Sequence, residues 1–306
     1  MNETALLINT ALASGTTLAF AALGLLVNER AGVLNLGAEG MMLVAAVAGF
    51  AVALTTGSDT LGFAAAAVAG AALAAVFGLL VIFLNTNQYA TGLALSLFGY
   101  GVSAFLGVSM VGRTLSARET HAVPVLSDLP FVGPALFSHH PMVYVAMGLT
   151  VAIAWFLYRT RAGLLLRAIG ENPEPAHALG YPVRLIRLAA VCVGGALCGL
   201  AGAYVSLVTA PLWVEGLTAG RGWIALVLTV FATWRPARAL LGAYLFGGVT
   251  VLQMNLQAQG VQISSHLLTM MPYVATVIVL ALISRNVAFI RLNMPASLGK
   301  PFRPGS

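Results

Sequence analysis

Charged side chains are scarce in this sequence. Asp, Glu, Lys and Arg together make up 8% of the 306 residues, whereas 59% are hydrophobic, and the mean hydropathy is +0.93. A soluble domain carries roughly 25% charged residues. A transmembrane barrel would alternate polar and apolar residues in segments of about ten, but the apolar runs here are long and continuous. The composition therefore predicts an all-α protein that crosses a membrane several times.

Cysteine is rare, and the common catalytic motifs are absent from the sequence. Cys192 and Cys198 fall inside one apolar run, which argues against a disulfide framework and against a cysteine-based metal site. There is no Gly-x-x-x-x-Gly-Lys-Ser/Thr phosphate loop, no His-Glu-x-x-His metal motif and no Gly-x-Ser-x-Gly nucleophile turn. We therefore expect a non-catalytic chain with no metal and no cofactor of its own.

Nine apolar runs are candidate membrane spans. A helix needs roughly 20 apolar residues to cross a bilayer core, so residues 1–306 are predicted to form one bundle of about 8–10 spans. The fifth and seventh runs are short, which leaves tilted, broken or re-entrant helices open for them. The first run follows no basic segment, so we expect it to be retained rather than cleaved as a signal peptide. The runs are 5–27, 39–56, 60–84, 90–111, 142–158, 186–208, 219–233, 238–256 and 268–284.

The positive charges are unevenly distributed between the loops. If the tail 285–306 is cytosolic and the spans alternate, 12 of the 15 Lys and Arg residues are cytosolic and 3 are not. Cytosolic loops of membrane proteins carry such an excess, so an outside N-terminus and a cytosolic C-terminus are predicted. This distribution also explains the net charge of +6 without nucleic-acid binding. The 12 are Arg30, Arg159, Arg161, Arg167, Arg184, Arg187, Arg235, Arg238, Arg285, Arg291, Lys300 and Arg303, and the 3 are Arg113, Arg118 and Arg221.

Polar residues interrupt the apolar pattern at 29–42, whose sequence is ERAGVLNLGAEGMM. One interpretation is a cytosolic turn that leads into the second span. The other is a broken membrane helix whose polar side chains face a translocation pathway. Asn35 and Glu39 would share a face if residues 35–39 were helical. An alternative role for Glu39 is to hold the broken segment through hydrogen bonds.

A second polar turn, 85–91, follows the third run. It is either an ordinary turn between two spans or the mouth of a pathway, where Asn87, Gln88 and Thr91 would offer hydrogen bonds. In the second interpretation these three residues join Asn35 and Glu39 as the candidate substrate pathway.

The longest loop on the predicted cytosolic side covers residues 159–187. Residues 163–169 are typical of a short amphipathic helix, and Asn172 with the following proline can begin a second one, because Pro is tolerated in a first turn. Gly180 suits the end of that helix, with Pro182 just beyond. These signals predict a rigid docking surface, and the alternative is a basic connector that only sets topology. In the later turn 233–238, Trp234 suits a membrane interface.

These stretches resemble the permease subunits of bacterial ATP-binding-cassette importers, in the branched-chain amino acid and simple sugar permease family. The pattern Glu-Arg-x-Gly-Val-Leu-Asn-Leu-Gly-x-Glu-Gly-Met-Met at 29–42 is similar to the members associated with nucleoside uptake. Residues 170–180 resemble the coupling segment of the family. Their Glu-Pro-Ala-x-x-x-Gly departs at its second position from the general importer pattern Glu-Ala-Ala-x-x-x-Gly, and no Ile-x-Leu-Pro follows. The resemblance covers nearly the whole chain.

The resemblance implies a multi-pass subunit of a bacterial inner membrane that passes a nucleoside by alternating access. It also implies partners: a second, different and longer permease chain, cytosolic ATPases that hold ATP and Mg²⁺, and an extracytoplasmic binding protein. A simple sugar or a branched-chain amino acid is the alternative cargo, and an ion-coupled secondary transporter is the alternative from another class. The residues that the resemblance assigns to ATPase coupling are Gly170, Glu171, Asn172, Glu174, Ala176 and Gly180.

Overall fold

Helices make up most of the computed structural model, which describes residues 3–115, 121–122, 132–259, 264–284 and 293–303. The helices are α1 (Glu3–Arg30), α2 (Ala38–Thr56), α3 (Asp59–Gly78), α4 (Gln88–Gly107), α5 (Val132–Leu136), α6 (Pro141–Arg159), α7 (Arg161–Glu171), α8 (Pro173–Ala178), α9 (Val183–Tyr204), α10 (Arg221–Phe231), α11 (Pro236–Ala258) and α12 (Ser265–Ser284). The π-helical turns η1 (Leu79–Phe83) and η3 (Val205–Thr209) extend α3 and α9, and the 3₁₀ turn η2 (Val108–Met110) extends α4. Two short strands, β1 (His121–Ala122) and β2 (Ser138–His139), pair antiparallel. This architecture confirms the predicted all-α polytopic bundle.

Within the described part of the chain, seven helices are long and apolar enough to cross a membrane. They correspond to seven of the nine predicted spans. The ninth run lies in α12, which has 20 residues and packs beside α11. The seventh run forms α10, whose 11 residues fit the short or broken helix that the sequence left open. Positive φ at Ala219 and Gly220 stops a helix from starting earlier.

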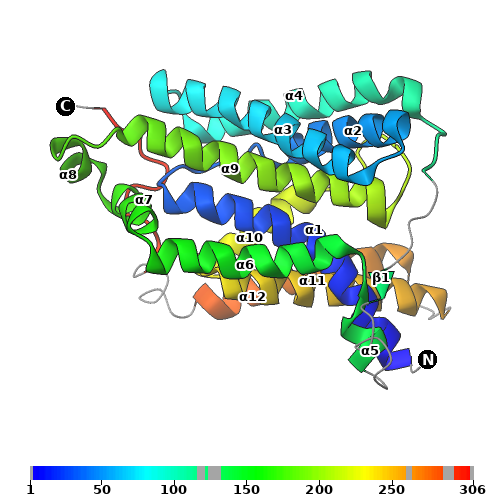
Figure 1. Cartoon of the computed structure of the whole chain (residues 1–306). Helices are drawn as coiled ribbons and strands as arrows, with labels where there is room; N and C mark the ends of the chain where they lie inside the picture. Colours follow the sequence, from blue (N-terminus) through cyan, green and yellow to red (C-terminus); the bar gives the residue numbers. More distant parts are fainter. Residues whose placement is uncertain (1–2, 116–120, 123–131, 260–263, 285–292, 304–306) are drawn as a thin grey trace.

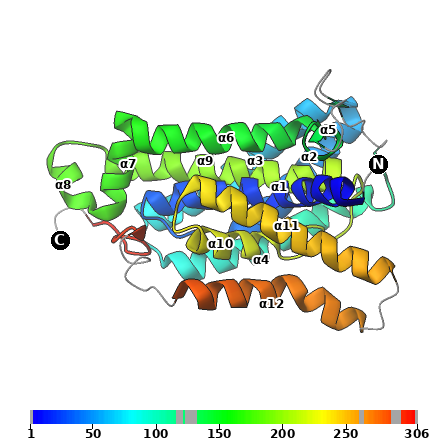
Figure 2. The ribbon, with the colours of Figure 1, turned by 90° about the horizontal axis from the view of Figure 1, so that it is seen from below.

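Helix α1 lies inside the bundle, where it packs against α9, α10 and α11, while α6 and α12 lie at opposite edges (Figure 2). Close approach depends on small residues. A Cβ at Gly70 of α3 would overlap the carbonyl oxygen of Gly195 in α9, and one at Gly24 of α1 would overlap that of Gly194. Without a hydrophobic force between helices in lipid, such contacts supply much of the packing energy.

Different connecting segments lie at the two ends of the bundle. The N-terminus lies at the same end as α5 and the β1–β2 pair, whereas α7, α8 and the C-terminal segment lie at the other end (Figure 1). The 159–187 loop meets the end of α1, where the break begins, because Gly170 of α7 packs against the carbonyl of Arg30.

Candidate translocation pathway and coupling surface

The chain is not helical between the end of α1 at Arg30 and the start of α2 at Ala38. Buried backbone groups in this break find partners on neighbouring elements. The amide of Leu34 donates to Oε1 of Gln88 at 2.8 Å, and the carbonyl of Leu36 accepts from the Ser96 hydroxyl at 2.8 Å. The chain is thus broken here, as one of the two sequence interpretations required.

The break rises along α4 into the depth of the bundle. Leu34 meets Gln88 at the start of α4, Leu36 packs against Gly92, and Gly40 packs against Gly99, midway along α4. Helix α2 therefore begins near the middle of the span rather than at its end. Non-helical backbone at this depth is stable only where protein or a water-filled cavity surrounds it.

Glu39 binds the N-terminus of α10. Its Oε1 accepts hydrogen bonds from the Thr218 hydroxyl and, at 2.9 Å, from the Gly220 amide, while Oε2 accepts from the Gly222 amide at 2.6 Å. The first amides of a helix lack partners within it, and its dipole favours an anion there. These contacts give Glu39 the alternative role of holding the broken segment, and its place in a pathway stays a prediction.

Asn35 is fully buried and lies in the non-helical part of the break. Its Oδ1 accepts from the Gly37 amide at 2.9 Å, and its Nδ2 lies 3.5 Å from the Met41 sulfur. Residues 35–37 are not helical, so the condition for a face shared with Glu39 is not met. The glycine-rich sequence and the local Asn35 turn replace the helix expected there.

The polar turn before α4 divides into local and long-range contacts. Asn87 is exposed and caps α4, accepting from the amides of Tyr89 at 2.9 Å and Ala90 at 3.1 Å. Thr91 donates to the Thr86 hydroxyl at 2.9 Å. Only Gln88, which is buried, reaches the break at residues 31–37. The structure therefore brings Gln88 and the break together, and the pathway role of all three residues stays a prediction.

A buried polar cluster lies at the end of α1. Trp234 donates its indole N–H to Glu29, whose other oxygen accepts from Thr229 at 3.3 Å. The guanidinium of Arg30 donates to the Trp234 carbonyl at 2.9 and 3.1 Å. Trp234 is only 1% exposed, so its expected place at the membrane interface is wrong. The buried carboxylate requires a donor, and the indole supplies it.

The 159–187 loop folds into two capped helices. The Thr160 hydroxyl accepts from the Gly163 amide at 3.0 Å to start α7, and Asn172 accepts from the Glu174 amide at 3.1 Å to start α8. Gly180 has φ of +86° and ends α8, its amide bonded to the His177 carbonyl at 2.9 Å. The predicted start at Asn172 and the glycine stop are thus confirmed, and the helix expected at 163–169 is longer and is capped by Thr160, which the sequence reasoning missed.

The six residues assigned to coupling divide into a surface set and a buried pair. Glu171, Asn172, Glu174 and Gly180 are exposed. Gly170 is buried because its Cα packs against the carbonyl of Arg30, and Ala176 is buried beside Phe302. Leu179, next to Gly180, is 77% exposed. An exposed leucine at a loop tip offers apolar area to a partner protein, while the buried pair can act only by positioning.

The C-terminal segment packs onto this loop, which the sequence did not indicate. The Ser297 hydroxyl donates to the Gly170 carbonyl at 2.7 Å, and the Ala296 amide donates to Glu171 at 3.3 Å. The buried Phe302 ring lies 5.6 Å from the ring of His177.

Among the described residues, no group of three His, Cys, Asp or Glu side chains could hold a metal ion.

Comparison with known proteins identifies the family. A family model described as the branched-chain amino acid transport system / permease component matches residues 7–289. The chain is 40% identical to the putative glucose ABC transporter permease protein TsgC13 of Haloferax volcanii, over 97% of each chain. It is 32% identical to the nucleoside ABC transporter permease protein NupC of Lactococcus lactis, over 92% of this chain and 93% of the relative.

A third relative is the guanosine ABC transporter permease protein NupQ of Bacillus subtilis, 30% identical over 93% of this chain and 92% of the relative. No solved structure matches the chain. The family match covers most of the chain, and the relatives match it nearly from end to end. The chain therefore belongs to the branched-chain amino acid transport system permease family and is a permease subunit of an ATP-binding-cassette transporter.

Proposed function

We propose that this chain forms half of the translocation pathway of an importer that carries a nucleoside and is driven by separate ATPase subunits. The pattern at 29–42 and the two relatives named as nucleoside and guanosine permeases support this cargo. The sequence has no phosphate loop, which supports ATP and Mg²⁺ being held by partner chains.

The hydrogen bonds of Glu29 and Glu39, the two carboxylates near the break, are the main support for a neutral cargo. Glu39 accepts hydrogen bonds from Thr218, Gly220 and Gly222, and Glu29 accepts from Trp234 and Thr229. Both oxygens of each carboxyl group therefore already have a donor within the chain. The ammonium group of an amino acid would gain most from a carboxylate without other donors in a low-dielectric path. A nucleoside needs only hydrogen bonds and apolar contact.

A simple sugar such as glucose is the second candidate cargo. The relative that is 40% identical is named as a putative glucose permease, and glucose is neutral and rich in hydroxyl groups. The same argument from occupied carboxylates supports it. Nucleoside and sugar differ in the flat apolar base, which a binding protein outside the membrane can select.

In the proposed mechanism the solute passes between this chain and a second, longer permease chain. Asn35, Glu39 and Gln88 shape the break at the middle of the bundle, while Asn87 and Thr91 border its outlet. The exposed surface around Glu174, Leu179 and Gly180 receives the motion of the ATPase pair. Gly170 and Ala176 pass that motion to α1 and to the C-terminal segment.

The proposed orientation places the N-terminus outside and the C-terminus with residues 159–187 in the cytosol of an inner membrane. The distribution of 12 basic residues against 3 supports it, as does the position of the termini at opposite ends of the bundle (Figure 1). Labelling of Glu174→Cys, in a background without Cys192 and Cys198, tests it. Labelling from the outside would reverse the assignment.

Uptake into proteoliposomes tests the function. The complete complex is reconstituted with its ATPase and binding protein, and uptake of guanosine, glucose and leucine is measured with and without ATP. ATP-dependent uptake of guanosine is the expected result. ATP-dependent uptake of glucose alone would support the second candidate. Uptake by this chain without any ATPase would instead support an ion-coupled secondary transporter.

A further inference from the structure

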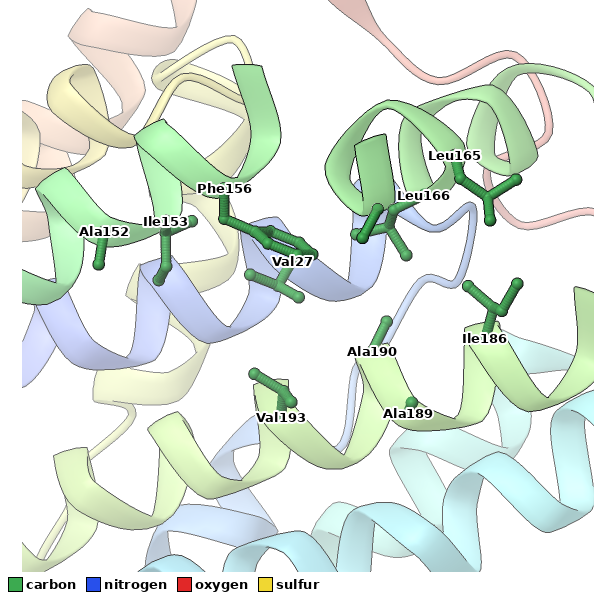
Figure 3. Close-up of a pocket in the computed structure, with 11 residues that line it drawn as sticks. Val27, Ala152, Ile153, Phe156, Leu165, Leu166, Ile186, Ala189, Ala190 and Val193 are labelled. Carbon is green, nitrogen blue, oxygen red and sulfur yellow. The ribbon is translucent and has the colours of Figure 1, made fainter. Parts of the chain in front are cut away.

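An apolar pocket of about 470 Å³ lies where α6, α7 and α9 meet the last turns of α1 (Figure 3). Its volume is in the range of ligand pockets. The close-up shows aliphatic and aromatic side chains facing one another across the space, and every lining residue is apolar. They include Val27 of α1, Ile153 and Phe156 of α6, Leu166 of α7, and Ile186 and Val193 of α9.

The pocket opens toward the side of the bundle. Val193 is 51% exposed, and the small residues Ala152 and Ala189 on either side of the space are exposed as well. Helices α6 and α9 are both long and apolar enough to span a membrane, so the pocket lies along the length of two candidate spans. A polar solute would find no hydrogen-bond partner on these walls.

Two arginines border the pocket at the corner between α6 and α7. Arg159 follows Ala152 and Phe156 on one face of α6, because their spacing is i, i+4 and i+7. Arg161, at the start of α7, lies one turn before Leu165, which lines the pocket. Both arginines are exposed, and neither forms an ion pair with a carboxylate within the described ranges. The corner is therefore apolar inside and cationic at its rim.

We propose that this pocket binds one hydrocarbon chain of a membrane lipid whose anionic phosphate headgroup is bound by Arg159 and Arg161. Basic sites between membrane helices recognise such headgroups. The lipid would fill the gap between α7, the first helix of the 159–187 loop, and α9, the span that follows this loop. Because Gly163 of α7 packs tightly on the Phe156 carbonyl, a bound chain beside Phe156 would fix the angle at which α7 leaves α6.

Native mass spectrometry of the assembled transporter tests the proposal. Phosphatidylglycerol or phosphatidylcholine with the same chains is added, and the retained lipid is counted. Arg159→Gln combined with Arg161→Gln should lower retention of phosphatidylglycerol about tenfold or more. Ala152→Leu combined with Ala189→Leu fills the pocket and should lower retention of both lipids. The controls Arg235→Gln and Ala94→Leu, at exposed positions away from the pocket, should match the wild type.

Two results would overturn the proposal. Equal retention in all variants would mean that only the general lipid shell is observed. Protection of Ala189→Cys from labelling when the second permease assembles, in delipidated complex, would mean that a protein covers the pocket. Thermal unfolding and size exclusion verify that each variant is folded, and the arginine and alanine pairs test the headgroup and the chain independently.

Discussion

The guanidinium of Arg187 donates a hydrogen bond to the hydroxyl of Ser297 at 2.9 Å, across 110 residues of sequence. Both side chains are buried, and the same hydroxyl donates to the Gly170 carbonyl at 2.7 Å. A charged group in this position needs partners, because its burial without them is unfavourable. Ser297 therefore joins the start of α9 to the end of α7 through the C-terminal segment.

Ser297→Ala should loosen the 159–187 loop. Among the described residues, the substitution leaves Arg187 with one hydrogen bond, to the Ile169 carbonyl at 3.4 Å, and its cation–π contact with Phe302. Loss of a buried hydrogen bond to a charged group destabilises by about 1–3 kcal/mol. Hydrogen exchange of residues 159–187 should rise and the unfolding temperature should fall. Thr55→Ala is the control, since that exposed hydroxyl bonds only to its own helix. Unchanged exchange in the loop would argue against the link.

Trp234→Phe should be among the most destabilising substitutions in the buried polar cluster of Glu29, Arg30 and Trp234. It removes the indole donor from the buried Glu29 and leaves only the 3.3 Å contact with Thr229. The expected loss is about 3 kcal/mol, measured by thermal unfolding in detergent. Adding Glu29→Gln should restore part of this loss, because the unpaired charge is then absent. Trp155→Phe, on the exposed face of α6, serves as the control.

Glu39→Gln should reduce uptake while the complex still assembles. Both carboxylate oxygens of Glu39 accept hydrogen bonds at the start of α10, but a glutamine has only one acceptor oxygen. Its NH₂ group would therefore face a donor with which it cannot form a hydrogen bond. The interaction between residue 39 and the start of α10 should weaken by about 1.5–3 kcal/mol. Asn35→Ala should also reduce uptake with assembly intact, by freeing the Gly37 amide and loosening the break. Wild-type uptake by both variants would remove the break from the pathway; Glu215→Gln, at an exposed position, is the control.

Gly180→Val should impair the proposed contact with the ATPase and so lower both transport and substrate-stimulated ATP hydrolysis. The backbone at Gly180 has φ of +86°, which a β-branched residue adopts at a cost of about 1–2 kcal/mol. A Cβ there meets nothing within 4 Å, so the effect arises from the backbone rather than from a clash. Uptake and substrate-stimulated ATPase should fall, while the ligand affinity of the binding protein should not change. Gly180→Asn should retain more activity, because Asn tolerates this conformation.

The end of the bundle that holds α5 should loosen in acid. His139 is buried, its Nε2 lies 3.0 Å from the Ala135 carbonyl, and burial lowers its pKa. The unfolded segment therefore binds a proton more readily, with an ordinary pKa of about 6.5. The contribution of neutral His139 to the free energy of unfolding is fully present above pH 6.5. It is lost as the pH falls through the lower pKa of the folded state. The protection factors of the amides in residues 132–144, which correct for the intrinsic pH dependence of exchange, should fall between pH 8 and 5, but not in His139→Gln; His177→Gln is the control.

Local signals in the sequence were sufficient for most of the spans and for the two helices of the 159–187 loop. Thr160, Asn172 and Gly180 each act on backbone groups within three residues, so their effects can be deduced without knowing the fold. Long apolar runs likewise determine the spans through burial in lipid.

The contacts that shape the break depend on the tertiary fold. Glu39 bonds to Gly222 across 183 residues, and Glu29 bonds to Trp234 across 205. Two of the groups that hold Glu39 are backbone amides, which every residue except proline carries, so no residue pattern identifies them. The late start of α10 likewise depends on positive φ at Ala219, which composition does not indicate.

The placement of Glu39 has an electrical consequence for the transporter. Its negative charge lies between the N-termini of α2 and α10, whose dipoles carry partial positive charge, and Arg221 follows at the start of α10. The cluster as a whole is therefore close to neutral. Moving one elementary charge across a membrane potential of 100 mV changes the free energy by about 2.3 kcal/mol. A rearrangement that moves a nearly neutral cluster along the membrane normal changes it by much less. In the proposed alternation between inward and outward states, this cluster would therefore add little to any dependence of the free-energy difference on the membrane voltage.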